Sequence, residues 1–445
     1  MMEHSYLERV RTADLVGRVG RVQKILPTYI EADGPNMPLG ALCRVEALSG
    51  VSTIASEPVL AEVVSVNANS IILVPFDDGV RTFSGARVEA CRDIDRAPVG
   101  DALLGRAVDA LGRPIDGKGA IRTLDFVPMS KAATAPLSRT SPKRVFETGV
   151  RAIDAFLTLA EGQRVGVFAA SGVGKTSLMT QLATQAKADR IVICLVGERG
   201  REVEALWSEG LSAEARAKTA LVAATSDQAA AMRVRAGDYA LAVAEHWRAE
   251  GHHVLLLLDS ITRLAMAMRE TGLAAGEPPT LRAYTPSVFA AIPKLVERCG
   301  ALKSGGAITS IMTVLSETDD IDDPISEMLK SLLDGHIILS RGLAERGHFP
   351  AIDVPRSISR LSRELMTERH RASAQDGVAL LSTYEASRTL IESGVYIPGS
   401  NPDIDRATER RPALMQYLKQ KQTERASLAS TTESLITVLG GARTT

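Results

Sequence analysis

The sequence predicts a multidomain α/β protein with a strand-rich N-terminal region, a mostly parallel, doubly wound central sheet and a helical C-terminal domain. Its 445 residues are enough for two to four domains of about 100 to 200 residues each. With 45% hydrophobic and 24% charged residues, the composition is that of an ordinary globular protein. The hydrophobic pattern changes twice along the chain, which divides it into predicted domains at residues 1–94, 95–362 and 363–445.

The N-terminal region consists of short stretches, over residues 15–88, in which apolar and polar residues alternate. Residues 28–32 run directly into Asp-Gly-Pro-Asn, and residues 62–66 run into Asn-Ala-Asn-Ser. Alternation with a period of two, interrupted by Gly, Pro and Asn, indicates β-strands joined by tight turns.

The central region, from about residue 145 to 345, contains aliphatic runs separated by amphipathic stretches of helical length. This pattern is typical of strands that crossover helices bury on both faces. The candidate strands are residues 164–168, 191–196, 220–224, 254–259, 307–315 and 336–340. After Ser362, Leu, Ala, Arg and Glu recur at helical spacing with one interruption at residues 396–402, which predicts a helical domain.

Charge and cysteine content narrow the classes of partner and compartment. The 52 Lys and Arg residues balance 53 Asp and Glu residues, so the chain has no net positive charge to attract the phosphates of a nucleic acid. We therefore expect no nucleic-acid partner. The four cysteines are far apart and form no C-x-x-C pair, which favours reduced thiols. The first thirty residues contain no signal-type apolar segment, and no aliphatic run approaches the roughly 18 residues that span a bilayer. We therefore expect a cytoplasmic protein, with peripheral membrane contact left open.

A phosphate-loop motif follows the predicted strand 164–168. It reads Ala169-Ala170-Ser171-Gly172-Val173-Gly174-Lys175-Thr176-Ser177, and an apolar pair at helical spacing comes next. In such a loop the backbone N–H groups and the helix N-terminus face the phosphates, Lys175 reaches the terminal ones and the Thr176 hydroxyl can ligate Mg²⁺. The strict pattern opens with Gly, where this chain has Ala169. Strand, loop and helix in this order predict a nucleotide site.

Two carboxylates are predicted at the same edge of the sheet as this loop. Asp259 ends the strand 254–259, and Glu198 follows the strand 191–196 within Gly-Glu-Arg-Gly-Arg-Glu. Taken alone, an aliphatic run ending in Asp is often a strand cap, and a mixed charge run is often a solvated loop. The neighbouring phosphate loop favours catalysis, because NTP hydrolysis needs a carboxylate on Mg²⁺ and another that activates water.

Several stretches together resemble the catalytic subunits of the rotary ATP synthase family. Residues 350–360, Pro-Ala-Ile-Asp-Val-Pro-Arg-Ser-Ile-Ser-Arg, match the family's alpha/beta signature P-A-I-D-x-x-x-S-x-S at every defined position. Within the family, residues 38–43, 285–289 and 319–336 are most similar to the flagellum-specific protein-export ATPases of type III secretion. The injectisome ATPases are a close second.

The resemblance implies an N-terminal β-barrel, a central RecA-like doubly wound P-loop ATPase domain and a C-terminal helical domain. It also implies a ring of six subunits with ATP between neighbours. By the same resemblance, Lys175 and Thr176 would hold phosphate and Mg²⁺, and Asp259 would position Mg²⁺. Glu198 would be the catalytic carboxylate, and Arg199 would contact the terminal phosphate.

Two further residues acquire roles only through the resemblance. Phe349, where the family usually has Tyr, would pack on the adenine face, and Arg360 would be an arginine finger given to the neighbouring subunit. Three further positions depart from the pattern of the export ATPases: Ala170 stands in place of the usual Gly, Thr176 in place of a common Ser, and Glu327 in place of a common Asp. Thr176 keeps the hydroxyl, and Ala170 removes only some backbone freedom, so activity is expected.

The predicted function is Mg²⁺-dependent ATP hydrolysis that drives flagellar type III protein export at the inner face of the cell membrane. The expected partners are further copies of the chain in a homohexamer, a regulator and stalk-like proteins of the export apparatus, and export substrates with their chaperones. The alternatives are an injectisome ATPase, a catalytic subunit of a rotary ATP synthase, a ring-shaped nucleic-acid translocase and a non-catalytic nucleotide-binding subunit. The last would be expected to lack Glu198.

Overall fold

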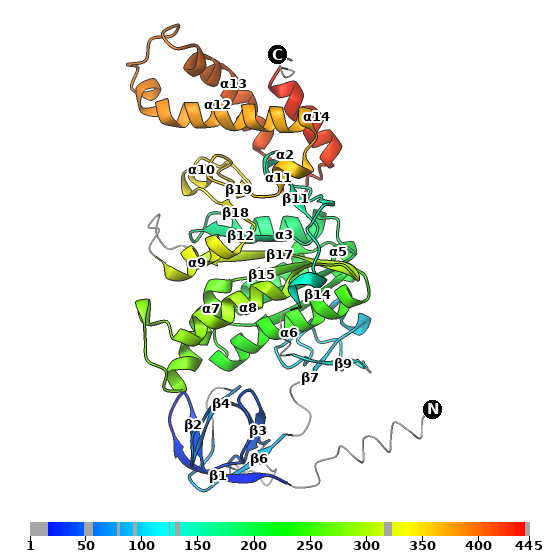
Figure 1. Cartoon of the computed structure of the whole chain (residues 1–445), viewed down its shortest axis with the longest axis vertical. Coiled ribbons are helices and arrows are strands. Elements are labelled where there is room, and N and C mark those ends of the chain that lie inside the picture. The colour runs from blue at the N-terminus through cyan, green and yellow to red at the C-terminus, as the bar shows by residue number, and fades with distance from the viewer. Residues whose placement is uncertain are drawn as a thin grey trace.

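The computed structural model of the chain describes residues 17–48, 57–77, 81–91, 96–123, 125–129, 134–315 and 323–440. An N-terminal β-barrel, a central sheet covered by helices and a group of C-terminal helices follow one another along the long axis of the molecule (Figure 1). The predicted fold class is therefore confirmed, while the boundaries after residues 94 and 362 remain predictions. Asp319 and Asp320, part of one stretch that carries the resemblance, lie outside the described residues.

The barrel is antiparallel and closed, with strand order β1-β2-β5-β4-β3-β6. Its strands are β1 (Val19–Ile25), β2 (Ile30–Ala32), β3 (Leu42–Val45), β4 (Val59–Val66), β5 (Ile71–Pro75) and β6 (Arg87–Ala90). Alternate side chains such as Val22, Val63 and Val88 fill its interior, as the period-two pattern predicts. Closure gives each of these strands a hydrogen-bonded neighbour on both sides.

The central sheet has nine strands, in the order β19-β18-β12-β17-β15-β13-β14-β8 with β16 paired to β17. The strands are β8 (Arg106–Val108), β12 (Arg164–Ala169), β13 (Arg190–Val196), β14 (Thr219–Ala224), β15 (His253–Asp259), β16 (Gly300–Leu302), β17 (Gly305–Leu315), β18 (Gly335–Ile338) and β19 (Ile358–Ser359). All pairings are parallel except β16 with β17 and β18 with β19. Two small antiparallel pairs, β7 (Arg96–Pro98) with β9 (Phe126–Pro128) and β10 (Val145–Phe146) with β11 (Leu159–Ala160), lie outside this sheet.

All six candidate strands of the central region are present, with small differences at their ends. The last one ends at Ile338 rather than Ser340, because the Ser340 side chain accepts a hydrogen bond from the Leu343 N–H and begins helix α10 (Arg341–Glu345). The sequence analysis missed the short strands β8, β16 and β19 of this sheet, which have too few residues to show a period.

Helices cover both faces of this sheet, so adjacent strand residues enter different cores. On β13, Val192 and Cys194 pack in one cluster with residues of α6 and α8, whereas Ile191 and Ile193 pack in a second cluster with α3. The helices of this region are α2 (Arg151–Phe156), α3 (Lys175–Gln185), α4 (Gly200–Ala205), α5 (Ala213–Ala217), α6 (Ala230–Ala249), α7 (Ile261–Ala274), α8 (Pro286–Arg298), α9 (Pro324–Leu332) and α11 (Ser362–Leu365). This double burial explains why the strands read as continuous apolar runs.

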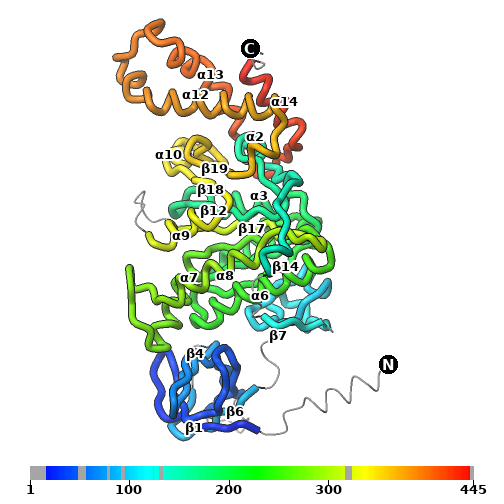
Figure 2. The backbone as a smooth tube through the Cα atoms, viewed as in Figure 1, coloured from blue at the N-terminus to red at the C-terminus, as the bar shows by residue number. Residues whose placement is uncertain are grey.

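The C-terminal helices are α12 (Glu368–Glu392), α13 (Pro402–Leu418) and α14 (Leu428–Val438). The predicted interruption falls between α12 and α13, where the Asn401 side chain caps α13 and Pro402 is its first residue. The backbone trace shows α12 and α13 as a hairpin on the far side of the sheet from the barrel (Figure 2).

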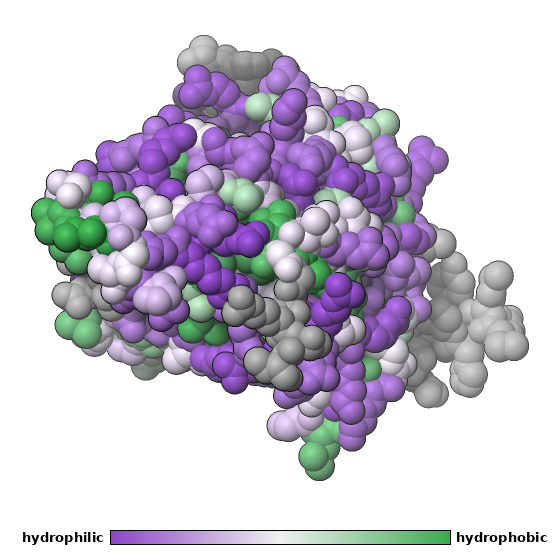
Figure 3. Space-filling view, turned by 90° about the horizontal axis from the view of Figure 1, so that it is seen from above, coloured by the Kyte–Doolittle hydropathy of each residue, from purple (hydrophilic) through white to green (hydrophobic). Residues whose placement is uncertain are grey.

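Seen from the helical end, the surface is mainly hydrophilic with separate apolar patches (Figure 3). Exposed apolar side chains at the end of α12 and in the turn that follows it include Leu390, Val395 and Ile397. Within the part of the chain that the structure describes, no helix is both long and apolar enough to cross a membrane.

Candidate active site

The phosphate loop connects β12 to α3 and has the geometry that phosphate binding requires. Gly172 and Gly174 have φ values of 80° and 93°, in the left-handed region that glycine adopts without strain. Gly174 caps α3, and the loop therefore ends at the positive end of an eleven-residue helix. Ala170, in place of the family's Gly, does not adopt a positive φ, so its methyl group is accommodated.

Lys175, the cationic side chain of the loop motif, contacts both predicted carboxylates. Its Nζ lies 3.1 Å from Oε1 of Glu198 and also contacts Oδ1 of Asp259. The three side chains are only 11%, 7% and 5% exposed, respectively. The structure thus brings together the loop and the ends of β13 and β15, as the edge rule for parallel strands predicts.

Asp259 is held in place by a residue of the neighbouring strand. The Thr313 hydroxyl, on β17, donates a hydrogen bond of 2.6 Å to Oδ1 of Asp259. Sequence reasoning found the strand that contains Thr313 but not this contact, because the register between β15 and β17 is a tertiary property. No local signal marks Thr313.

Glu198 lies next to a second cation that the sequence analysis did not assign a role. The Arg263 Nε lies 3.6 Å from Oε1 of Glu198, and the Arg263 guanidinium also donates to the Gly197 carbonyl. Arg263 belongs to α7 and follows Asp259 by only four residues. The short separation between Asp259 and Arg263 in the sequence was the signal that could have placed Arg263 near the site.

The environment of Glu198 raises its pKa above the ordinary value for glutamate. Burial is the main cause and the neighbouring Glu202 adds to it, whereas Lys175 and Arg263 oppose the shift. A raised pKa brings a carboxylate closer to the proton affinity that a general base needs near neutral pH. The arrangement can therefore accept a proton from a water molecule beside the loop.

The other predicted residues near the phosphate loop are more exposed than the cluster of Lys175, Glu198 and Asp259. Thr176 and Ser177 are exposed at the start of α3. Arg199 follows Glu198 directly, but its side chain is 70% exposed, and its Nε lies 4.0 Å from the Glu202 carboxylate. The Phe349 ring lies against the phosphate loop, since a Cβ added to Gly174 would stand 3.2 Å from a ring carbon of Phe349.

Arg360 is a predicted residue whose position in the fold keeps it away from this site within one chain. Its backbone N–H donates to the Asp334 carbonyl, and Asp334 pairs through its own N–H with Arg164, the first residue of β12. The phosphate loop follows the other end of β12, about 16 Å away at the usual rise per strand residue. The Arg360 side chain is exposed and donates to the Lys330 carbonyl.

Comparison with known proteins gives consistent similarities over nearly the whole chain. Residues 149–359 match the ATP synthase alpha/beta family, nucleotide-binding domain, and residues 366–437 match the T3SS EscN ATPase C-terminal domain. The flagellum-specific ATP synthase of Bacillus subtilis is 42% identical over 440 residues, which are 99% of each chain. The type 3 secretion system ATPase of Sinorhizobium fredii is 42% identical and covers 91% of this chain and 88% of its own length.

Solved structures are also similar to this chain over most of its length. The assembled ATPase EscN from the type III secretion system of enteropathogenic E. coli superposes with a TM-score of 0.88 at 39% identity, covering 95% of this chain and all of that one. EscN solved in complex with its central stalk EscO superposes with a TM-score of 0.86.

Proposed function

Because the chain belongs to the family of the flagellum-specific ATP synthases and type 3 secretion system ATPases, we propose that it is the Mg²⁺-dependent ATP hydrolase of a flagellar type III protein-export apparatus. One observation carries the proposal: Lys175 of the phosphate loop, Glu198 and Asp259 converge in one buried cluster. This is the set of groups that phosphoryl transfer from ATP to water requires.

In the proposed reaction, water attacks the γ-phosphorus of ATP while the bond to the β,γ-bridging oxygen breaks. Glu198 accepts the proton of the attacking water, and ADP leaves with the electron pair of the broken bond. Lys175 and the loop N–H groups stabilise the charge that develops on the phosphate oxygens. Arg199 is exposed next to Glu198 and would turn inward to contact the terminal phosphate.

The residues of the site suit Mg²⁺ bound together with ATP. Among the described residues, no group of three or more His, Cys, Asp or Glu side chains could hold a metal ion without other ligands. Mg²⁺ bound with a nucleotide needs only one or two protein oxygens, because phosphate oxygens and water complete its shell. The Thr176 hydroxyl and the Asp259 carboxylate are oxygen ligands of the kind that Mg²⁺ prefers, and Mg²⁺ there would neutralise charge on the phosphates.

We further propose that the active form is a homohexamer in which each chain gives Arg360 to its neighbour's site. Two features support this: Arg360 is exposed, and it lies at the opposite end of β12 from its own phosphate loop. Phe349, which is 44% exposed beside Gly174, would offer one ring face to adenine.

The proposed partners are a stalk-like protein, a regulator of the export apparatus, and export substrates with their chaperones, with the ring docked at the cytoplasmic face of the membrane. A stalk is supported by the EscN relative, which was solved with its central stalk. Injectisome export is the second candidate function, favoured by the TM-score of 0.88 to EscN. The match of residues 366–437 to the T3SS EscN ATPase C-terminal domain favours either export role over a rotary ATP synthase subunit.

The test combines purified protein with cells. We expect phosphate release from ATP that requires Mg²⁺ and that Lys175→Ala abolishes. We also expect the gene to restore filament assembly in bacteria that lack their flagellar export ATPase, and Glu198→Gln to fail to do so. Restoration of injectisome secretion without flagellar assembly would favour the second candidate. Stimulation of hydrolysis by RNA would contradict both.

A further inference from the structure

We propose that Asp334, held by Arg164, is a positioning residue that sets the orientation of Arg360 toward the neighbouring subunit. This inference rests on the proposed role of Arg360 in trans. The Asp-Gly-His motif that begins at Asp334 is part of the family resemblance, but it has no role in the site described above.

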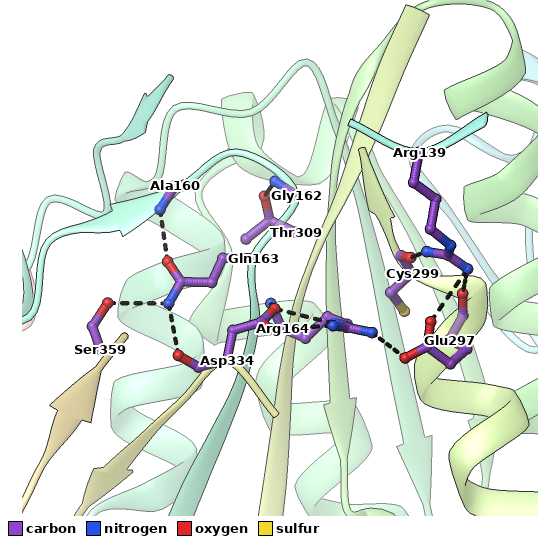
Figure 4. A network of polar contacts seen from close by, with 10 residues as sticks. All are labelled: Arg139, Ala160, Gly162, Gln163, Arg164, Glu297, Cys299, Thr309, Asp334 and Ser359. Carbon is purple, nitrogen blue, oxygen red and sulfur yellow. Dashed lines mark hydrogen bonds and ion pairs between the residues drawn. The ribbon is translucent and has the colours of Figure 1, made fainter. Parts of the chain in front are cut away.

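The Asp334 carboxylate is fixed by three hydrogen bonds from one residue. The backbone N–H and the Nε of Arg164 donate to Oδ2 of Asp334 at 3.0 and 3.1 Å, and Nη2 of Arg164 donates to Oδ1 at 3.1 Å (Figure 4). A guanidinium that meets both oxygens of a carboxylate defines its orientation as well as its position. Asp334 is therefore attached firmly to the first residue of β12.

The backbone of the same residue holds Arg360. The Asp334 carbonyl accepts a hydrogen bond of 3.0 Å from the Arg360 N–H, and its own N–H donates to the Arg164 carbonyl at 2.8 Å. Asp334 thus joins the strand that leads to the phosphate loop with the segment that carries the proposed finger.

A second set of hydrogen bonds holds Ser359, the residue before Arg360. The Gln163 side-chain amide, fully buried, donates to the Ser359 hydroxyl at 3.0 Å and to the Asp334 carbonyl at 3.3 Å. The Ser359 hydroxyl in turn donates to the Thr158 carbonyl at 3.2 Å. Figure 4 shows Gln163 between Ser359 and Asp334.

The close approach of β19 to β18 gives independent support. A Cβ added to Gly335 would stand 2.6 Å from the Ile358 carbonyl oxygen, so only glycine permits this contact. Hydrogen bonds and close packing together fix the backbone of residues 358–360, whereas the Arg360 side chain is exposed. The main chain is thus rigid just where the side chain must reach another subunit, and an error of about 1 Å in such a group can cost 10²-fold in rate.

Glu297, which contacts the Nη1 atom of Arg164, provides a matched control for substitution of Asp334. The Nη1 of Arg164 lies 2.6 Å from Oε1 of Glu297 on α8, and Glu297 also pairs with Arg139. Glu297 is thus in the same charged network, but no contact links it directly to Asp334 or Arg360 in the described residues. If Asp334 acts through Arg360, Glu297→Gln should leave turnover within about twofold, as expected for a partly exposed ion pair.

The experiment measures ATP turnover of the full-length chain at ring-forming concentration, with nucleotide binding and oligomer size as parallel readouts. Asp334→Asn should lower turnover at least tenfold while nucleotide affinity and ring formation stay unchanged. The double variant Asp334→Asn/Arg360→Ala should be no slower than Arg360→Ala alone. A further loss in the double variant would overturn the proposal, since Asp334 would then act independently of Arg360.

Mixed rings test the direction of the effect. Asp334→Asn chains should regain activity with Glu198→Gln chains, whose Arg360 is intact, but not with Arg360→Ala chains. Arg360→Ala and Glu198→Gln chains could complement each other while Asp334→Asn and Glu198→Gln chains do not. The positioning role of Asp334 would then be wrong, and the role of Arg360 as a finger in trans would be supported. If Arg360→Ala and Glu198→Gln do not complement each other, the finger itself is wrong.

If Asp334→Asn fails to fold or assemble, Arg164→Lys replaces it in every arm. This substitution keeps the charge and the backbone hydrogen bonds but loses the guanidinium contacts with the carboxylate. The same complementation pattern would support the proposal, and full turnover in Arg164→Lys would overturn it.

Discussion

The ammonium group of Lys175 lies 3.1 Å from the carboxylate of Glu198. This contact joins the cation expected to hold the terminal phosphates to the group expected to accept the proton from water. Both side chains are about nine-tenths buried, at 11% and 7% exposure, so the contact is poorly screened by solvent. Substitution of one residue therefore changes the electrostatics of the other.

Lys175→Ala should abolish hydrolysis and weaken nucleotide binding by about tenfold or more, because a charge-assisted contact with phosphate is worth about 1.5–3 kcal/mol. Turnover assays and calorimetric titration with a nucleotide would measure the two effects. Lys187→Ala is the matched control, since Lys187 is a lysine just beyond α3 whose side chain is 59% exposed and pairs with Glu147. Near-normal turnover in Lys175→Ala would refute the site assignment.

Glu198→Gln should leave ATP binding nearly intact while turnover falls by about 10² or more, because an amide can orient water but cannot take its proton. Single-turnover kinetics with a binding titration separates these effects. Glu204→Gln, at an exposed position of α4, should change neither quantity. Equal losses of binding and turnover in Glu198→Gln would instead make Glu198 a structural residue.

The pH dependence of kcat/KM should have its acid limb above the ordinary glutamate pKa of 4.5, because burial raises the pKa of Glu198. The base acts when ionised, so a higher pKa moves the loss of activity on acidification to higher pH. Glu202→Gln removes a neighbour that adds to this shift, so the limb should move to lower pH. An identical acid limb in the two proteins would contradict the assignment of Glu198 as the base.

Turnover per chain should rise steeply with protein concentration as rings form, because Arg360 then reaches the neighbouring site. Arginine fingers in related phosphoryl-transfer systems are worth about 10³ or more, and Arg360→Ala should flatten the rise without changing nucleotide binding. Arg341→Ala is the control, since Arg341 is also an exposed arginine, with a side chain that is 78% exposed and paired with Glu345.

Mixing Arg360→Ala with Glu198→Gln chains should restore activity that neither variant has alone. The restored activity would come from interfaces that join an intact Glu198 pocket to an intact Arg360. Inactive mixtures, in rings demonstrated to contain both chains, would show that the finger does not act in trans.

Much of the central fold and of the site could be predicted because its signals are local. The phosphate loop is a continuous segment between a strand and a helix, so Lys175 and Thr176 could be assigned from residue types and order alone. The convergence of Glu198 and Asp259 on Lys175 required one more rule, that parallel strands end at a common edge. Phe349 and Arg360 came only from the family resemblance, since neither stands in a local pattern that implies its role.

The sequence by itself determined the candidate site residues Lys175, Glu198 and Asp259 and the strands that they follow or end. It could do so because the hydrophobic period and the composition of a loop depend only on residues that are close together in the chain. Only the tertiary structure decided that Thr313 holds Asp259, that Arg263 approaches Glu198 and that Arg164 binds the Asp334 carboxylate. Arg164 and Asp334 are 170 residues apart in the chain, and their contact depends on β12 and β18 being neighbours in one sheet. Strand order and register arise from packing of the whole core, so no local pattern encodes them.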